Sequence, residues 1–137
     1  MIDFSLTDAQ QEVQRTARVF AEREILPRIR EMDESATYDR SLYEKMGAEG
    51  LLGLPIPERY GGAGMDYIAF ALLCEEMERA DTAFRVILSV HTGLNSLTLL
   101  QWASEEQKER YPVPQARGEK LATFGLTEPG VGSDAAN

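Results

Sequence analysis

The sequence predicts an all-α fold, in which one helical domain is followed by a short segment of different character. Residue pairs that cap helix N-termini recur along roughly the first 110 positions. Between them, apolar residues return every three or four positions, which is the spacing of a buried helix face. Proline and glycine clusters, which break regular structure, are confined to a few short stretches. The 137 residues are enough for one ordinary domain.

The first predicted helix begins after Thr7, which forms a capping box with Gln10 three residues later. Its apolar residues share one face of the helix: Val13, Ala17, Phe20, Ala21 and Ile25. Pro27 is expected to kink or end this helix, because proline has no N–H to donate and its ring clashes with the preceding turn. Residues 33–39 predict a polar connection, and residues 40–50 predict a second, shorter helix.

The middle of the chain predicts an irregular loop followed by two more helices. Residues 51–66 hold two prolines and the glycine cluster Gly61-Gly62-Ala63-Gly64, which forbid regular structure. Asp66 predicts the cap of a third helix, and Asp81 or Thr82 predicts the cap of a fourth that runs to about residue 103. This fourth helix is apolar on nearly every side, so it is expected to lie buried at the centre of the domain.

The last helical segment begins at a second capping box, formed by Ser104 and Gln107. Pro112 and Pro114 are expected to stop this short helix. Residues 121–126 then form a short β-like run, and a glycine-rich loop follows over residues 127–134. An isolated strand leaves its backbone groups unpaired, so this run needs partner strands. We therefore expect it to be the first strand of a β-rich domain that is cut off in this sequence.

Composition disfavours several classes of protein. The net charge of −9 opposes binding to nucleic acid and attachment to membranes through basic residues. No apolar run approaches the roughly 20 residues of a membrane helix, and residues 1–4 lack the pattern of a signal peptide. Cys74 and His91 are the only residues of their types, so no structural zinc site or internal disulfide is expected, and a reducing compartment fits.

The run Phe124-Gly-Leu-Thr-Glu-Pro-Gly-Val-Gly-Ser-Asp134 resembles the flavin-binding motif of the acyl-CoA dehydrogenases, at the start of their middle β domain. Residues 51–66 and 104–108 resemble two other segments of that family, in the same order. The resemblance covers the whole chain. It implies the N-terminal helical domain of the acyl-CoA dehydrogenase fold over residues 1–119. Residues 120–137 would then be the first strand and flavin-binding loop of a β-barrel domain that is not included.

The resemblance also assigns cofactor-binding residues. Backbone groups at Phe124 and Leu126, together with Thr127, should meet the pyrimidine edge of the FAD ring. Gly132 and Ser133 should lie near the pyrophosphate, with Ser133 also near the acyl-CoA substrate. The residue types suit this task, since glycine lets backbone approach a ligand closely, and successive N–H groups with a hydroxyl can bind an anion.

Arg85 and Ser89 are the predicted substrate-binding residues of the fourth helix. They belong to a polar stripe that continues with Thr92 and Ser96 and that must be exposed, paired or lining a cavity. Residues 84–90 resemble glutaryl-CoA dehydrogenase, in which the matching arginine binds the distal carboxylate of the substrate. Residues 89–92 also resemble short-chain acyl-CoA dehydrogenases, so both subfamilies remain open. The alternative for Arg85 is a pair with an acidic residue of a later domain, or exposure to solvent.

The resemblance implies oxidation of an acyl-CoA thioester to the 2,3-enoyl-CoA, with hydride transfer to flavin N5. It implies a homotetramer that passes electrons to electron-transfer flavoprotein, in the cytoplasm or in the mitochondrial matrix of a eukaryote. The catalytic base of most members is a glutamate in the C-terminal domain, so this chain holds no catalytic residue and is expected to be inactive alone. The alternatives are an acyl-CoA oxidase and a non-catalytic helical interaction module.

Overall fold

The computed structural model describes residues 4–136, so residues 1–3 and 137 of the two predicted domains lie outside the described part. The α-helices are α1 (Asp8–Phe20), α2 (Leu26–Ser35), α3 (Arg40–Ala48), α4 (Tyr67–Ala80), α5 (Thr82–Leu88), α6 (Leu97–Trp102), α7 (Glu105–Arg110) and α8 (Pro112–Ala116). Segments of π-helix join two pairs of them, Ala21–Ile25 between α1 and α2, and Ser89–Ser96 between α5 and α6. No strand occurs between residues 4 and 136, and the all-α prediction is confirmed.

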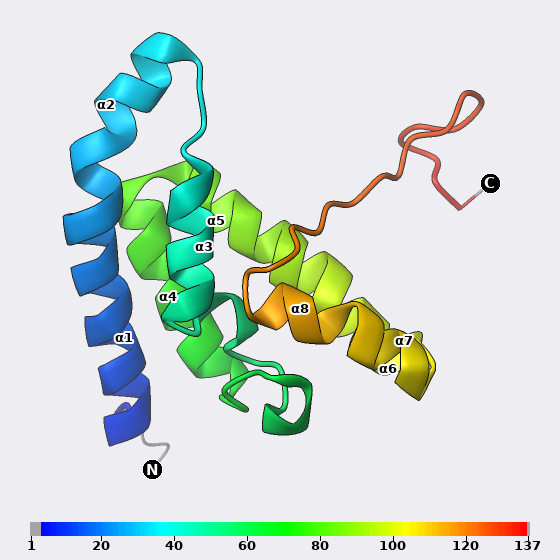
Figure 1. Ribbon diagram of the computed structural model, residues 1–137, viewed down its shortest axis with the longest axis horizontal. Coiled ribbons are helices and arrows are strands. Elements are labelled where there is room, and N and C mark those ends of the chain that lie inside the picture. The colour runs from blue at the N-terminus through cyan, green and yellow to red at the C-terminus, as the bar shows by residue number, and fades with distance from the viewer. Residues whose placement is uncertain (1–3, 137) are drawn as a thin grey trace.

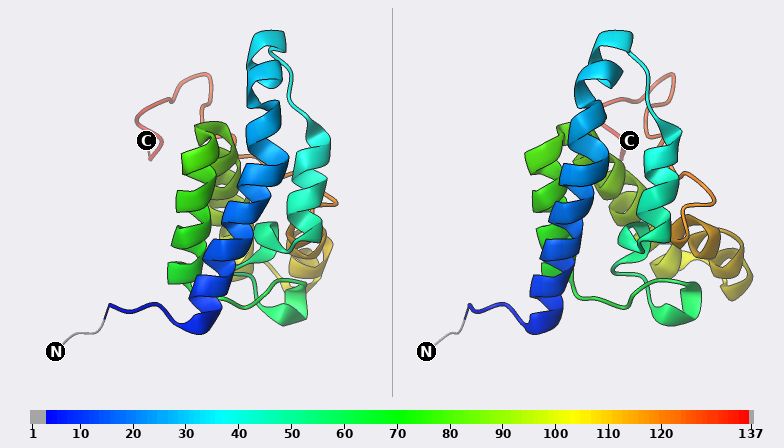
Figure 2. Two further views of the ribbon diagram at one scale, coloured as in Figure 1. Left: turned by 90° about the vertical axis from the view of Figure 1, so that its left-hand side faces the viewer. Right: turned by 60° about the vertical axis from the view of Figure 1, so that its left-hand side comes forward.

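α1 and α2 form one long rod that stands beside α3 and α4 (Figures 1 and 2). The capping box of Thr7 and Gln10 is present, and the apolar face of α1 is buried, as predicted. The helix does not end at Pro27, because the π-helical turn before it changes the hydrogen-bond register. Pro27 then sits in the first turn of α2, where a missing N–H costs little. The polar connection is therefore shorter than predicted and covers residues 36–39.

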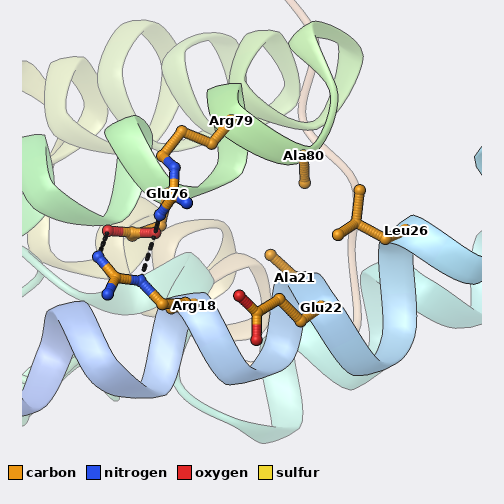
Figure 3. A pocket seen from close by; sticks show the side chains of 7 residues that line it. All are labelled: Arg18, Ala21, Glu22, Leu26, Glu76, Arg79 and Ala80. Carbon is orange, nitrogen blue, oxygen red and sulfur yellow. Dashed lines mark hydrogen bonds and ion pairs between the residues drawn. The ribbon is translucent and has the colours of Figure 1, made fainter.

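A buried carboxylate fastens α1 to α4. The Glu76 side chain is almost fully buried and accepts two hydrogen bonds from the Arg18 guanidinium, at 3.1 and 2.7 Å (Figure 3). Arg79 donates a third at 2.6 Å. The hydrogen bonds from Arg18 hold the pKa of Glu76 below its usual range, against the opposing effect of burial. These partners offset the cost of burying a charge between two helices.

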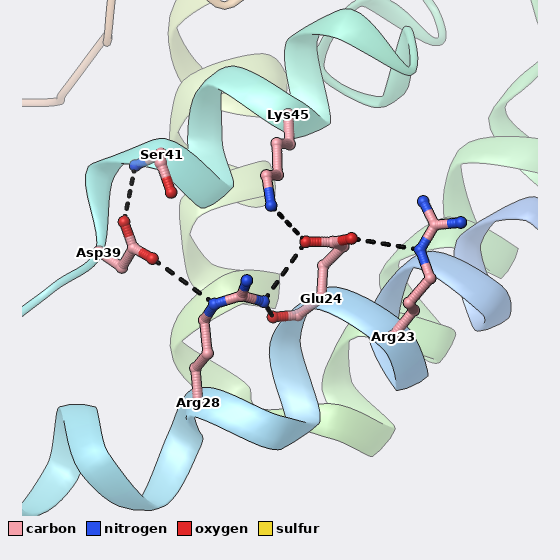
Figure 4. A network of polar contacts seen from close by, with 6 residues as sticks. All are labelled: Arg23, Glu24, Arg28, Asp39, Ser41 and Lys45. Carbon is pink, nitrogen blue, oxygen red and sulfur yellow. Dashed lines mark hydrogen bonds and ion pairs between the residues drawn. The ribbon is translucent and has the colours of Figure 1, made fainter.

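A second polar network joins the rod to α3 (Figure 4). Glu24 forms ion pairs with Lys45, Arg28 and Arg23, and the hydrogen bond from Lys45 lowers the pKa of Glu24. Arg28 also lies 3.7 Å from Asp39, whose carboxylate caps α3 by accepting the Ser41 N–H at 2.9 Å. Most of these side chains are partly solvated, so the network orients the α2–α3 turn more than it stabilises the fold.

Residues 51–66 form a compact loop, as predicted, and contain the short 3₁₀ turns Leu51–Gly53 and Glu58–Tyr60. The loop folds back on itself so tightly that a Cβ atom on Gly62 would lie 2.0 Å from the Ile56 carbonyl oxygen. Gly53 accepts hydrogen bonds from the N–H groups of Ile56 and Ala63, which closes the loop from within. It is therefore a rigid packing element between helices.

The fourth predicted helix runs without a break from Thr82 to Trp102 and is capped by Asp81, which accepts the Ala83 N–H at 2.7 Å. The expectation that it is buried on every side is wrong. Phe84 and Leu88 are buried, but Leu94 is 46% and Trp102 is 78% exposed. Its main contacts within residues 4–136 are with α4, α8 and the Leu51–Gly53 turn.

This helix also corrects the expectation that no segment is long and apolar enough for a membrane. It has 21 residues, and its mean hydropathy over 18 residues is 1.2, with 28% of that window buried. By length and composition alone it is the one helix in the described part of the chain that could cross a bilayer. Core helices of soluble proteins share this length and composition.

The capping box of Ser104 and Gln107 is present at α7, as predicted. Pro112 does stop α7, but it also occupies the first turn of a further helix, α8, which the sequence did not predict. The β-like run at residues 121–126 forms no strand. Beyond it, Glu128 and Val131 form an isolated bridge within a turn, and this segment extends away from the helices (Figure 1).

Candidate functional site

The predicted flavin-binding residues lie together on one exposed segment. Phe124 and Leu126 are each about half exposed, and Thr127, Gly132 and Ser133 are exposed. The Glu128 and Val131 backbones exchange hydrogen bonds of 2.9 and 3.1 Å, which close the turn between them. Within the described chain, residues 124–136 form no hydrogen bonds other than these two.

The donor groups on this segment fit an anionic cofactor such as FAD. The hydroxyls of Thr127 and Ser133, and the backbone N–H of Gly132, have no partner among the described residues. A Cβ atom on Gly130 or Gly132 would meet no atom within 4 Å. The segment therefore supplies donors for one side of a ligand and does not enclose it.

Arg85 and Ser89 are adjacent on the fourth helix, and Arg85 has an acidic partner in this same domain. Its Nε donates to Glu78 Oε2 on α4 at 2.8 Å, and its Nη1 lies 3.5 Å from Ser89 Oγ. This hydrogen bond lowers the pKa of Glu78. The sequence had offered two alternatives for Arg85, an acidic partner in a later domain or exposure to solvent. Neither of them included Glu78. A guanidinium has five N–H donors, so the Nη groups retain capacity for a ligand.

The predicted polar stripe splits in two. Thr92 and Ser96 are buried, with hydrogen bonds of 2.8 Å to the Leu52 carbonyl oxygen and to Gln115 Oε1. Arg85 and Ser89 remain partly exposed. The prediction assumed α-helical spacing, whereas residues 89–96 are π-helical and have more residues per turn. The later residues are therefore rotated away from the earlier ones.

Sequence reasoning missed an open groove beside this helix. It lies between the 51–66 loop and the outer side of the fourth helix, and its lining residues are Pro55, Pro57, Tyr67, Gly93, Leu97, Thr98, Leu100 and Gln101. The signal for it was the exposed apolar side of the helix, which was instead assigned to the core. Among residues 4–136, no group of three or more His, Cys, Asp or Glu side chains could hold a metal ion.

Cys74 and His91 both belong to the interior. Burial raises the pKa of the Cys74 thiol, which makes it a poor nucleophile. His91 is 1% exposed and makes hydrogen bonds to Gln115 and Ala122. Its bond to Ala122, which precedes the glycine-rich segment, was not predicted.

Comparison with known proteins agrees with this architecture. The family described as "Acyl-CoA dehydrogenase, N-terminal domain" matches residues 7–119. A short-chain-specific acyl-CoA dehydrogenase of Clostridium acetobutylicum is 40% identical over 98% of this chain and 35% of its own length. Among solved structures, butyryl-CoA dehydrogenase from Megasphaera elsdenii gives a TM-score of 0.92 at 36% identity, covering 98% of this chain and 36% of that one.

A glutaryl-CoA dehydrogenase from Mycobacterium smegmatis, solved in complex with FADH2, gives a TM-score of 0.89 at 34% identity, over 96% of this chain and 34% of that one. The chain thus spans about a third of the length of the relatives it matches. The match extends over nearly the whole chain at substantial identity. The chain therefore belongs to the acyl-CoA dehydrogenase family, and residues 7–119 match its N-terminal domain.

Proposed function

We propose that this chain is the N-terminal part of an FAD-dependent enzyme that oxidises a short acyl-CoA to the 2,3-enoyl-CoA. One observation carries the proposal. A helical domain of the acyl-CoA dehydrogenase family leads directly into an exposed segment whose glycines and hydroxyls suit a flavin. Butyryl-CoA dehydrogenase and short-chain relatives support a short acyl chain.

Residues 120–137 begin the middle domain of the proposed enzyme. Backbone groups at Phe124 and Leu126, with Thr127, would hold the pyrimidine edge of FAD, while Gly132 and Ser133 would hold the pyrophosphate. The flavin, when bound, supplies an acceptor for the hydride that leaves the β-carbon of the substrate. The residues of this chain would bind and orient the cofactor through backbone N–H groups and hydroxyls.

The same proposal includes a homotetramer, electron-transfer flavoprotein as the electron acceptor, and location in the cytoplasm or the mitochondrial matrix. It places the catalytic base in a later domain. No carboxylate of this chain is assigned as the base, so the chain alone should turn over no substrate. It should also bind FAD weakly, because the segment supplies donors for only one side of the cofactor. Gel filtration of the 137-residue chain with excess FAD should give a colourless protein, and a stoichiometric yellow protein would contradict this.

The full-length protein tests the proposed reaction. Anaerobic addition of butyryl-CoA should bleach the visible absorption of its flavin, and electron-transfer flavoprotein should restore it. Rapid recovery with oxygen alone, with formation of hydrogen peroxide, would make the protein an acyl-CoA oxidase. If the purified full-length protein contains no flavin, the alternative of a non-catalytic helical interaction module would replace the proposed enzyme.

A second candidate substrate is an acyl-CoA with a distal carboxylate, such as glutaryl-CoA. The Nη donors of Arg85 that are not used by Ser89 favour it, because a guanidinium can bind a carboxylate through two hydrogen bonds. The pair with Glu78 opposes it by neutralising much of the charge. In that case Arg85→Ala should reduce kcat/KM for glutaryl-CoA by about 30-fold or more, equivalent to about 2 kcal/mol, and spare butyryl-CoA.

Arg79→Ala is a matched control, since Arg79 is also a partly exposed arginine of this region whose side chain pairs with a glutamate on α4. It should leave the ratio of the two kcat/KM values unchanged. A wild-type preference for butyryl-CoA, with equal losses for both substrates in Arg85→Ala, would exclude the distal carboxylate.

A further inference from the structure

Three side chains from the helical part hold the backbone of residues 120–123, just before the glycine-rich segment. The Tyr43 hydroxyl on α3 donates to the Lys120 carbonyl oxygen at 3.2 Å. The Ala122 N–H donates to His91 Nδ1 at 3.1 Å. The Asn95 side-chain amide donates to the Thr123 carbonyl oxygen at 3.2 Å. Beyond these contacts, the chain leaves the helices (Figure 1).

The bond from Ala122 fixes the protonation of His91. Nδ1 must be unprotonated to accept this N–H, so the ring proton lies on Nε2, which faces the Gln115 carbonyl oxygen at 3.1 Å. Burial lowers the pKa of His91, which keeps the ring neutral. The Tyr43 hydroxyl lies 2.6 Å from Nδ1, so its one proton is shared between Nδ1 and the Lys120 carbonyl oxygen, and the two rings meet edge to face. The ring is thus oriented from two sides.

The Asn95 contact is supported in the same way. Gln115 on α8 donates from its side-chain Nε2 to Asn95 Oδ1 at 3.0 Å, which turns the Asn95 amide nitrogen toward Thr123. The Gln115 side chain is itself held by Ser96 Oγ at 2.8 Å. A continuous chain of hydrogen bonds therefore leads from the buried interior to the exit of the segment.

This polar cluster occupies a place where apolar side chains would contribute more to stability. His91, Ser96 and Gln115 are buried, and burying polar groups is costly even when each one finds a partner. The π-helix Ser89–Ser96 that presents His91 and Asn95 on the same side is itself a rare conformation, which recurs at functional sites. What the cluster achieves is a defined path for the outgoing backbone.

We propose that His91, Tyr43 and Asn95 are positioning residues for FAD binding, which act by fixing the backbone at residues 120–123. The inference rests on the proposed function. Phe124 follows Thr123 directly, so an error in the anchored backbone is carried into every donor of the segment. The three residues touch no cofactor atom themselves and work only through the backbone that they hold.

The anchor can be tested in the 137-residue chain without any flavin. In uniformly ¹⁵N-labelled protein, the His91 ring should show a protonated Nε2 and an unprotonated Nδ1, with a scalar coupling between Nδ1 and the Ala122 amide nitrogen across the hydrogen bond. Hydrogen exchange at Ala122 should be slow and should accelerate in His91→Leu. A ring protonated on Nδ1, or fast exchange at Ala122 in the wild type, would overturn the inference.

The consequence for FAD is tested in the full-length protein by measuring the dissociation constant of FAD. His91→Leu should weaken binding by about tenfold or more, the effect typical of losing an outer contact that orients a ligand-binding group. Asn95→Ala removes the second contact at a partly exposed position, so it tests the inference even if His91→Leu does not fold. His91→Asn can place its side-chain oxygen near the position of Nδ1, so it should restore much of the affinity.

Thr92→Val is the matched control. Thr92 is equally buried on the same π-helix, but its hydroxyl bonds to Leu52 and not to residues 120–123. It should lower stability without weakening FAD binding. Equal losses of affinity in Thr92→Val and His91→Leu, or no loss in His91→Leu and Asn95→Ala, would overturn the inference while leaving the proposed function intact. A wild-type protein that binds no FAD would instead overturn the proposed function together with the role in FAD binding.

Discussion

The helical body, residues 7–119, and the segment at residues 124–136 differ in what determines their structure. The body is held by buried apolar side chains and by polar contacts between helices, such as Glu76 with Arg18. The segment has exposed side chains and, within the described chain, only the backbone pair of Glu128 and Val131. The body therefore specifies its own fold, whereas the segment displays groups that a ligand or further structure must complete.

The largest expected effect is on a glycine of the body. Gly62→Ala should lower the free energy of unfolding by about 3 kcal/mol or more, because the new methyl group would lie 2.0 Å from a backbone oxygen that cannot move freely. Chemical denaturation followed by circular dichroism measures it. A loss below 1 kcal/mol would mean that the 51–66 loop is much less rigid than its contacts indicate.

A buried charge of the body gives the next effect. Glu76→Gln should cost about 2 kcal/mol, since charged hydrogen bonds to Arg18 and Arg79 are replaced by weaker ones. Glu12→Gln is the control, because Glu12 pairs with Arg15 on an exposed surface, where such pairs contribute less than about 1 kcal/mol. Equal losses in the two variants would show that burial gives Glu76 no special weight.

His91 lies where the body meets the segment, and its protonation should make the stability of the chain depend on pH. The pKa of folded His91 is lowered, so the unfolded chain binds a proton more readily, and stability is fully present above the unfolded pKa of about 6.5. Below it, the free energy of unfolding should fall by up to about 1.4 kcal/mol per pH unit until the lowered pKa is reached. The lowered pKa values of Glu24 and Glu76 place their contributions at lower pH.

Thermal unfolding of the wild type and of His91→Asn between pH 7 and 5 measures this effect. The wild type should lose stability on acidification, and the variant should show a flatter profile over the same range. Parallel profiles would show that His91 does not enter the fold as a neutral ring.

The smallest expected effect on stability is at a glycine of the segment. Gly132→Ala should change the free energy of unfolding of the 137-residue chain by less than about 0.5 kcal/mol, since its new methyl group meets no atom. In the full-length protein, the same change should weaken FAD binding, because Gly132 is proposed to lie at the pyrophosphate. A large loss of stability in the isolated chain would mean that the segment packs on the body.

Local signals in the sequence predicted much of the body. The capping residues Thr7, Asp66 and Ser104 act within one helical turn, so they can be recognised from adjacent positions. The π-helical segments could not be predicted in this way, because they depend on packing between helices. For that reason the possible helix end at Pro27 is wrong, and Thr92 does not share a face with Arg85.

Contacts between distant residues were the other gap. The fourth helix is apolar on nearly every side, so its composition does not show which side is covered. The bond between His91 and Ala122 joins residues 31 positions apart, and only the folded chain brings them together. A single histidine among apolar residues was the one available signal. The flavin-motif residues were placed by family resemblance, and their roles stay predictions.

Residue-resolved hydrogen exchange of the 137-residue chain tests the contrast between body and segment most directly. Amides within α1, α3, α4 and the fourth helix should exchange slowly, protection should persist to Ala122, and amides of residues 124–134 should exchange at nearly the rate of an unstructured peptide. Strong protection within residues 124–134, or its absence from the helices of the body, would contradict the account.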